Sequence, residues 1–373
     1  MTKTRIWLIS VALLLGFASV IAAGELTPAS RISLHVVRIG AMSVERAGHQ
    51  ATLLKTGQVL ITGGCAGRGC DRILASVEIY DPATQTFKVV APMSTPRASH
   101  TATLLPNGRV MVCGGWTGSN ATSSAEIYDP AKDQWTAAGN MTQARVSQIA
   151  VPVQDGRVLI MGGGTGRLGN LASAEIFDSS TGTFSAVGRM RTNHYLATAL
   201  ADGRVLVSGG QDSQGRILRT AEIFNPKTNT FKPTGDMIVP RVKHAAALLP
   251  DGKVLIIGGS DARGYQARFR STEIYDPSMG RFSAGQEMHW GRHKIRDAVA
   301  VVPSGAVLVA GGAVHPELFD PTQRKFIPVQ GELSGPQMFA TATPLPDGDV
   351  LVLGGYDEHT QASASAWLVR LGR

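Results

Sequence analysis

The stretch HTATLLPNGRVMVCGG, residues 100–115, carries the pattern that decides the fold, and the rest of the chain repeats it. It ends in one of seven Gly-Gly doublets, which recur at intervals of 43 to 53 residues. The doublets are Gly63-Gly64, Gly114-Gly115, Gly163-Gly164, Gly209-Gly210, Gly258-Gly259, Gly311-Gly312 and Gly354-Gly355. A regular period of this length indicates a solenoid, a propeller or an array built from one supersecondary unit.

A second motif, Glu-aliphatic-aromatic, follows six of the doublets after a spacer of variable length. Its glutamates are Glu78, Glu126, Glu175, Glu222, Glu273 and Glu317. An aromatic residue lies nine positions after each glutamate, at Phe87, Trp135, Phe184, Phe231, Phe282 and Phe326. Constant spacing within the motif and variable spacing before it predict rigid strands that follow a loop of variable length.

Each unit reads as four strands, which we call a to d. In the second unit, strand a covers 100–105, and the turn at 106–108 contains the glycine that a tight hairpin needs for positive φ. Strand b, 109–113, is a continuous apolar run, as expected of a strand buried on both faces. Strand c, 125–128, is followed by Asp-Pro, and strand d carries the aromatic residue at Trp135. Such units bury both faces only by packing on one another, which predicts a β-propeller of antiparallel blades.

The two ends of the chain complement each other. The last unit contains strands a, b and c, with c at 364–371, but it lacks strand d. An additional strand, 32–38, precedes the first unit and places Val36 at the position of the strand-d aromatic. We therefore predict an all-β, seven-bladed propeller whose last blade is closed by an N-terminal outer strand.

These features resemble the Kelch repeat: four apolar residues, Gly-Gly, and then a spaced Tyr or Phe and a Trp or Phe. The resemblance covers residues 32–371. Kelch propellers include protein-binding adaptors, actin-binding proteins, sialic acid mutarotases and the central domain of the copper-radical galactose oxidase. The resemblance therefore implies the fold and leaves the function open.

The galactose-oxidase-like centre implied by one branch of this family requires a cysteine cross-linked to a copper-binding tyrosine, a second tyrosine and two histidines. One of those histidines comes from an additional C-terminal domain. In this chain the sequence ends with the propeller, and no cysteine pairs with a tyrosine in the repeat pattern. We expect neither a cofactor nor a metal site.

The first residues differ from the repeats. Lys3 and Arg5 precede an apolar run, 6–23, that ends in small residues. This pattern predicts a signal peptide over 1–23, which leaves 24–373 as a single propeller domain. The alternative is an uncleaved signal anchor, because the run nearly reaches spanning length. We expect a secreted or periplasmic protein, without a membrane span after cleavage.

The cysteines and the overall charge limit the possible partners. Cys65 and Cys70 lie in one loop and are expected to form a disulfide in an oxidising compartment, with a two-ligand metal site as the alternative. Cys113 is expected to be a buried free thiol. The net charge is +8, but there is no Lys/Arg run or basic stripe, so nucleic acid is not indicated. We expect a monomer that binds a protein or a glycan.

An Arg-x-x-His pattern recurs where strand a begins. Its arginines are Arg46, Arg97, Arg145 and Arg241, and its histidines are His49, His100 and His244. Recurrence in the same position favours a structural role over a metal site. The strand-c glutamates need partners if they are buried, so we predict contacts between these glutamates and the arginines or histidines.

Departures from the repeat are the candidate ligand-binding residues, with a solvated loop as the alternative interpretation. The fourth unit loses two residues and contains His194 and Tyr195, while the sixth gains two. The sixth unit contributes Trp290, Arg292, His293, Lys294, Arg296 and Asp297, and its short b–c loop holds His315. The other b–c loops contribute Arg68, Trp116, Arg167, Arg263, Tyr265 and Tyr356.

The variable b–c loops share one face of the propeller with the d–a connections, which marks that face as the binding face. Its aromatic rings and guanidinium groups suit recognition of sugars or proteins. We therefore predict an exported, non-catalytic binding module for a protein or glycan ligand. The alternatives are a carbohydrate-active enzyme, mutarotase-like or galactose-oxidase-like, with a site at the mouth of the central channel, and a purely structural module.

Overall fold

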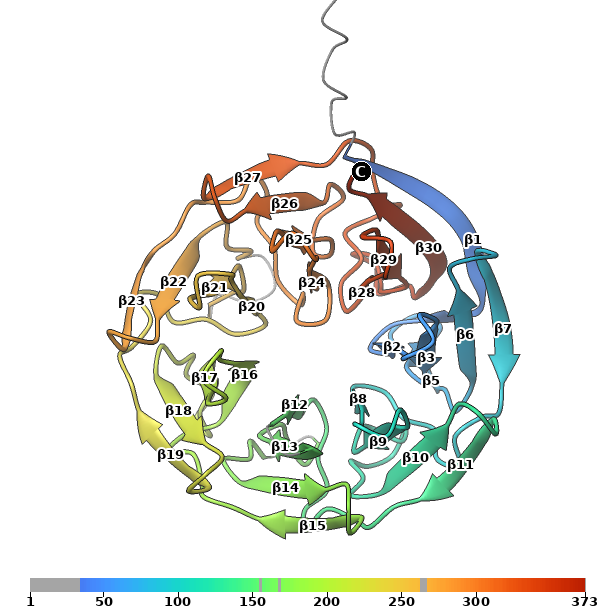
Figure 1. Cartoon of the computed structure of the whole chain (residues 1–373), viewed down its shortest axis with the longest axis horizontal. Helices are drawn as coiled ribbons and strands as arrows, with labels where there is room; N and C mark the ends of the chain where they lie inside the picture. Colours follow the sequence, from blue (N-terminus) through green and yellow to red (C-terminus); the bar gives the residue numbers. More distant parts are fainter. Residues whose placement is uncertain (1–33, 154–155, 167–168, 262–266, 373) are drawn as a thin grey trace, which may run out of the picture. The chain divides into compact units, whose positions relative to one another are not determined.

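The computed structural model describes residues 34–372 apart from 154–155, 167–168 and 262–266. The described residues form a ring of seven four-stranded antiparallel sheets and include no α-helix (Figure 1). The predicted fold class is confirmed. The predicted signal peptide and its cleavage position lie outside the described residues.

We number the blades by the unit that supplies strand a, and each blade runs from the innermost to the outermost strand. Blade 1 contains β2 (Gln50–Leu53), β3 (Val59–Thr62), β6 (Val77–Asp81) and β7 (Thr86–Val90). Blade 2 contains β8 (Thr101–Leu104), β9 (Val110–Cys113), β10 (Ala125–Asp129) and β11 (Gln134–Ala137). Blade 3 contains β12 (Ile149–Pro152), β13 (Arg157–Met161), β14 (Ala174–Asp178) and β15 (Thr183–Ala186). Blade 4 contains β16 (His194–Ala199), β17 (Val205–Gly210), β18 (Ala221–Asn225) and β19 (Thr230–Pro233). Blade 5 contains β20 (Ala245–Leu248), β21 (Val254–Ile257), β22 (Thr272–Asp276) and β23 (Arg281–Ala284). Blade 6 contains β24 (Val299–Val301), β25 (Val307–Val309), β26 (Glu317–Asp320) and β27 (Lys325–Pro328).

Blade 7 closes the ring with strands from both ends of the described chain. It contains β28 (Thr341–Pro344), β29 (Val350–Leu353), β30 (Ser363–Arg370) and, as its outermost strand, β1 (His35–Arg46). Val36 lies opposite Val369 in the same register that places Phe87 opposite Tyr80 in blade 1. Figure 1 shows β1 beside β30 at the edge of the ring. The predicted N-terminal closure is confirmed.

The Gly-Gly doublets permit neighbouring blades to approach closely. Gly63 has a φ of +57°, and a Cβ atom there would lie 2.4 Å from the carbonyl oxygen of Arg97 in the next blade. Apolar side chains fill the space between blades, for example Leu60 and Val77 of blade 1 against Val112 of blade 2. Each blade therefore completes its core only with its neighbours, which is why the sheets close into a ring.

Buried ion pairs join the beginning of strand a to strand c within five blades. The pairs are Arg46–Glu78 (2.8 Å), Arg97–Glu126 (2.8 Å), Arg145–Glu175 (2.9 Å), Arg241–Glu273 (2.8 Å) and Arg292–Glu317 (3.4 Å). The same guanidinium also donates to a doublet carbonyl, as from Arg97 to Gly114 at 2.8 Å. The carboxylate in turn accepts a backbone N–H from the d–a connection, as from Ser94 to Glu126. For five of the six glutamates these distances agree with the contacts that the sequence predicts, and the contacts fix the d–a connection on those five blades.

The three repeated histidines connect neighbouring blades. His49 Nε2 lies 3.0 Å from Thr341 Oγ1 of blade 7, and His100 Nε2 lies 2.9 Å from Thr62 Oγ1 of blade 1. His244 Nε2 lies 3.3 Å from a hydroxyl of blade 4. Burial, followed by the charge of Arg46, lowers the pKa of His49 to about 3, so the ring is neutral at physiological pH.

Candidate functional site

The d–a connections meet around the axis of the propeller in a series of backbone hydrogen bonds. Ser147 donates to Ser99, Ser99 to Gly48, Gly48 to Phe339, Phe339 to Lys294 and Lys294 to Lys243, at 2.8 to 3.2 Å. All six residues have positive φ, between 51° and 60°. We call these six residues the axial ring, and they belong to the d–a connections that lead into blades 1, 2, 3, 5, 6 and 7. Because their backbone is fixed in this way, their side chains are held at the centre of the d–a/b–c face.

The two residues inserted in the sixth unit reach the opposite side of the axial ring. Arg296 donates to the carbonyl oxygens of Ser147 and Gln148 in blade 3, both at 3.2 Å. It also pairs with Asp297 at 3.3 Å, and Asp297 accepts a hydrogen bond from Gln50 of blade 1. Blades 3 and 6 lie opposite each other in the ring (Figure 1). The insertion therefore ties three separate blades together across the axis.

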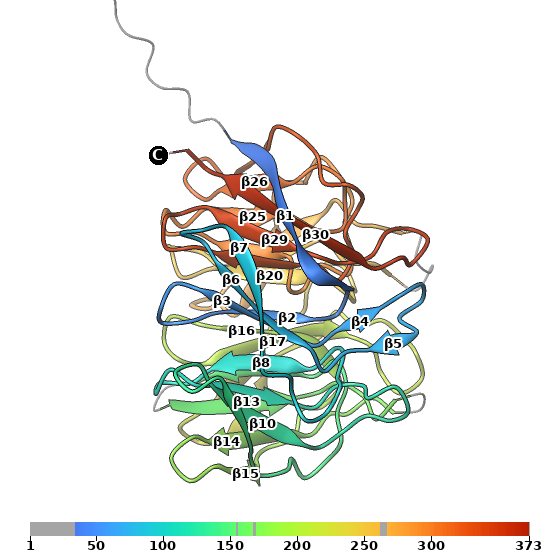
Figure 2. The ribbon, with the colours of Figure 1, turned by 90° about the vertical axis from the view of Figure 1, so that its right-hand side faces the viewer.

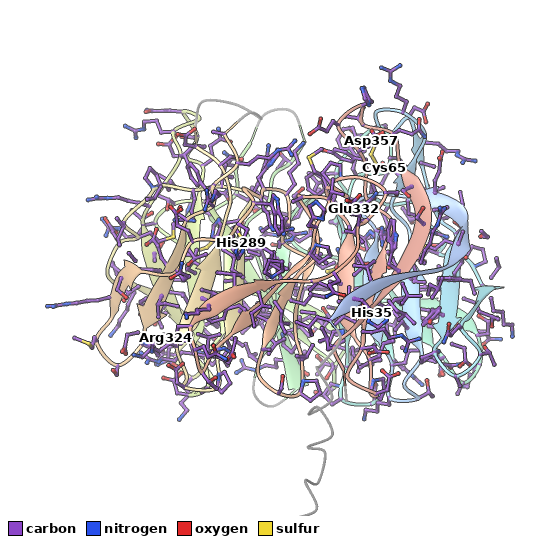
Figure 3. The ribbon with its side chains drawn as sticks, turned by 90° about the horizontal axis from the view of Figure 1, so that it is seen from above. His35, Cys65, His289, Arg324, Glu332 and Asp357 are labelled. Atoms are coloured by element: carbon purple, nitrogen blue, oxygen red, sulfur yellow. A yellow bond between two sulfur atoms is a disulfide. The ribbon has the colours of Figure 1, made fainter. Side chains whose placement is uncertain are left out.

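A pocket of about 250 Å³ opens beside the axial ring, between blades 7, 1 and 2. Its lining residues are Ala47, Gly48, Ser99 and Phe339 from d–a connections, Cys65, Gly69 and Cys70 from the b–c loop of blade 1, and Tyr356 and Thr360 from that of blade 7. We call it the axial pocket. Figure 3 shows the two b–c loops close together, with Cys65 beside Asp357, and Figure 2 shows β4 (Cys65–Ala66) and β5 (Arg72–Ile73) on the same face. The predicted disulfide Cys65–Cys70 is confirmed and forms part of the pocket wall.

An aromatic pair forms the blade 7 side of the axial pocket, and a lysine outside the pocket wall packs against this pair. The rings of Phe339 and Tyr356 are 5.6 Å apart, and Lys294 Nζ donates to the Tyr356 hydroxyl at 2.6 Å. The ammonium lies 4.9 Å from the Tyr356 ring centroid and 5.7 Å from that of Phe339. Burial, together with the charges of Lys243 and Arg268, lowers the pKa of Lys294 to about 8.

Positive charge gathers on the side of blades 5 and 6. Lys243, Lys294 and Arg268 lie close enough for their charges to lower the pKa of His293 to about 3, after the larger effect of burial. Arg268 pairs with Glu358 at 2.9 Å, which joins the b–c loops of blades 5 and 7 on either side of the short blade 6 loop. The site therefore has an aromatic side and a cationic side around one axis.

The remaining sixth-unit candidates form a separate group. The Trp290 ring lies 4.8 Å from the His315 ring and 5.6 Å from the His289 ring, and Trp290 is half-buried. Arg292 is fully buried in the fifth of the Arg–Glu pairs, and His293 is buried beside it. The sixth-unit residues are thus divided between the axial ring, the cross-axis bridge and the Trp290 group.

The other candidates are not among the lining residues of the axial pocket or lie outside the described residues. Arg68 is exposed and its backbone bridges to Gln361, and Trp116 is half-buried with backbone hydrogen bonds to Ala98. His194 and Tyr195 begin β16, but their side chains are outside the described set. Arg167, Arg263 and Tyr265 lie outside the described residues.

Sequence reasoning missed Phe339 and Lys243. Both occupy the positive-φ position of the repeat, where other blades place Gly48, Ser99 and Ser147. A comparison of this position across the units would have identified them, since a bulky aromatic side chain replaces a small residue there.

Comparison with known proteins agrees with this architecture. The family profile of the Kelch motif matches residues 52–94, 97–142, 145–191, 193–238 and 241–289. The chain belongs to the Kelch-motif family. No curated protein matches it. A solved structure of a novel fungal alcohol oxidase with catalytic diversity among the AA5 family, in complex with copper, is similar with a TM-score of 0.70 and 18% identity. The match covers 90% of this Kelch chain and 75% of the oxidase, and at this identity it shows the fold alone.

Two further observations concern membranes and metals. Within the described residues, no helix is long and apolar enough to cross a membrane. In the same part of the chain, no three side chains of His, Cys, Asp or Glu come together in an arrangement that could hold a metal ion.

Proposed function

We propose that this Kelch propeller is an exported, non-catalytic binding module that recognises a protein or glycan ligand through its d–a/b–c face. The axial pocket is the anchor for that ligand. The observation that carries the proposal is the composition of its wall: Phe339, Tyr356 and the Cys65–Cys70 disulfide are departures from the repeat that converge on one cavity. Export is supported by the disulfide, because such bonds persist in oxidising compartments.

The size and chemistry of the pocket indicate what the ligand would insert. A volume of about 250 Å³ is below the range of about 300–1,000 Å³ typical of pockets for drug-sized molecules. It suits one sugar ring or one amino-acid side chain, held against the faces of the Phe339 and Tyr356 rings. Lys294 donates to the Tyr356 hydroxyl and thereby holds the Tyr356 ring in place beside the pocket.

The test compares two aromatic residues on the same face. Glycan and protein arrays with the purified chain identify a ligand, and titrations then compare Phe339→Ser with Trp290→Ser. Loss of stacking in the Phe339 variant is expected to weaken binding at least about tenfold, or about 1.4 kcal/mol. The Trp290 variant is the matched control and is expected to bind normally. Weak binding by the Trp290 variant with normal binding by the Phe339 variant would place the ligand at the sixth-unit group instead.

A carbohydrate-active enzyme is the second candidate, and the Lys294–Tyr356 pair favours it. An amine whose pKa lies near 8, hydrogen-bonded to a phenol, suits proton transfer to and from a bound sugar. Among the described residues no three side chains of His, Cys, Asp or Glu come together as a metal site, and we derive no step through copper. Proton NMR of monosaccharides incubated with the chain tests this candidate. Turnover that disappears in Tyr356→Phe supports it, and spectra that match the protein-free sample exclude it for those sugars.

A further inference from the structure

The disulfide of the axial pocket lies where the ring closes. Its loop belongs to blade 1 but is docked on the b–c loop of blade 7, since Gly69 N–H donates to Thr360 O at 2.9 Å. On the other side of the loop, Gly67 N–H donates to the Glu45 carboxylate at 2.8 Å, and Ala362 N–H donates to Gly67 O at 3.4 Å. The loop therefore connects the first and last blades on the binding face, while β1 connects them at the outer edge.

The two sulfurs of this disulfide have different surroundings. Cys65 is 3% exposed, and its Sγ lies 3.4 Å from the Ala47 carbonyl oxygen. Cys70 is half-buried and lines the pocket together with Gly69 and Thr360. Cys70 also has a φ of +63°, a conformation that costs free energy for a residue with a side chain. Both cysteines line the pocket, and an incoming thiol reaches Cys70 more readily because Cys70 is the more exposed of the two.

We propose that the axial pocket is a site of thiol–disulfide exchange with a small thiol. The thiolate of the incoming molecule attacks Cys70 Sγ, a new S–S bond forms, and the Cys65–Cys70 bond breaks. The incoming thiol is oxidised to a mixed disulfide with Cys70, and Cys65 is reduced to a thiol that takes up the proton released by the incoming thiol. The Cys65 thiol can then donate to the Ala47 carbonyl oxygen, which already lies at hydrogen-bond distance from sulfur.

Three features of the site make Cys70 the sulfur that is attacked. It is the accessible partner, opening the loop allows its strained φ to relax, and the departing Cys65 sulfur has an acceptor in place. Exposed or strained disulfides exchange more readily than covered ones. The pocket volume of about 250 Å³ favours a small thiol over a folded protein as the reacting molecule.

The experiment treats the native chain with a limiting amount of N-acetylcysteine, quenches with acid and maps the adduct by peptide mass spectrometry. The expected adduct on Cys70 exceeds that on Cys65 by at least about tenfold. The buried Cys113 stays unmodified and reports that the protein remained folded. An adduct mainly on Cys65, or no adduct unless Cys113 also reacts, would overturn the proposal. A cysteine-containing peptide in place of N-acetylcysteine is expected to react more slowly, and an equal or faster rate would refute the small-thiol assignment.

Single-cysteine variants provide a second measurement. Cys65→Ser leaves Cys70 as a thiol at the pocket, which is expected to be alkylated at least about tenfold faster than the covered thiol left by Cys70→Ser. Equal rates in two variants that keep wild-type circular dichroism would contradict the assignment of Cys70. This result is separate from the proposed binding function, because ligand titrations of the same variants report the pocket independently of exchange.

Discussion

Blades 2 and 7 have the same arrangement of four strands, but they carry charged and uncharged residues, respectively, at the repeated positions. Blade 2 has Arg97 and His100 where strand a begins and Glu126 in strand c, whereas blade 7 has Gln337, Ala340 and Trp367. Trp367 lies opposite Val352 just as Glu126 lies opposite Val112, and it is 2% exposed in an apolar cluster. In blade 7 both charges of the ion pair are replaced together. No buried charge is left without its partner, which would be the costly outcome.

Blades 2 and 7 also differ in the residue that each contributes to the axial ring. Blade 2 contributes the small Ser99 and blade 7 contributes the bulky Phe339, and both line the axial pocket. The repeated residues hold each blade in place, and the residues that depart from them supply the candidate site.

Loss of the arginine of the Arg–Glu pair in blade 2 should lower the free energy of unfolding far more than loss of the glutamine at the same position in blade 7. Arg97→Ala leaves the Glu126 carboxylate buried beside no cation, which is expected to lower the free energy of unfolding by about 3–5 kcal/mol. Gln337→Ala in blade 7 removes a neutral side chain and is expected to cost only about 1 kcal/mol. Urea unfolding of both variants measures the difference, and equal losses would show that the charges carry no special role.

The lowered pKa of Lys294 predicts a pH-dependent stability. Its pKa is about 8 in the folded protein and near the ordinary 10.5 in the unfolded chain, so between these values the unfolded state binds more protons. The stability of the wild type should therefore rise with pH across this range, by up to about 3 kcal/mol relative to Lys294→Met. Thermal unfolding at several pH values between 8 and 10.5 tests the sign. Parallel curves for the two proteins would place the Lys294 pKa at its ordinary value.

Ring closure predicts that a core-facing valine of β1 matters more for stability than an exposed valine of another outer strand. Val36 of β1 packs on the blade 7 core, whereas Val89 of β7 is 59% exposed. Val36→Asp places a carboxylate against apolar side chains and is expected to lower the free energy of unfolding by about 1–3 kcal/mol. Val89→Asp should change it by less than about 0.5 kcal/mol. Similar values for the two variants would argue against β1 as a structural strand of the last blade.

The smallest expected effect concerns the bridge across the axis. Arg296→Met removes hydrogen bonds to two blade 3 carbonyls and is expected to cost about 1–2 kcal/mol. Arg324 also pairs with an aspartate, but on the exposed surface, so Arg324→Met should cost at most about 0.5 kcal/mol. Differential scanning calorimetry can rank the two, and a larger loss for Arg324 would rule out the bridge as a structural tie.

Most of the fold could be predicted because the same strand pattern recurs in seven units of the sequence. The aligned positions of Gly63, Glu78 and Phe87 define strands b, c and d, and the register of Val36 then follows from counting. The disulfide could be predicted because Cys65 and Cys70 share one loop.

The candidate site was less accessible to sequence reasoning, because it depends on contacts between units. The meeting of Tyr356, from the seventh b–c loop, with Lys294, from the sixth d–a connection, is not encoded in any local pattern. Arg292 illustrates the opposite difficulty. The sequence placed it among unusual residues, although its spacing to Glu317 within the sixth unit serves the same buried ion pair as in other blades.

The most direct test of the central idea, that the pocket of blades 7, 1 and 2 anchors the ligand, is hydrogen–deuterium exchange with and without the ligand found by array. We predict that binding slows exchange in the segments 67–70 and 356–361, which border the axial pocket, and leaves 313–316 beside Trp290 unchanged. Slower exchange confined to 313–316, with no change in the two loops of the pocket, would contradict the account.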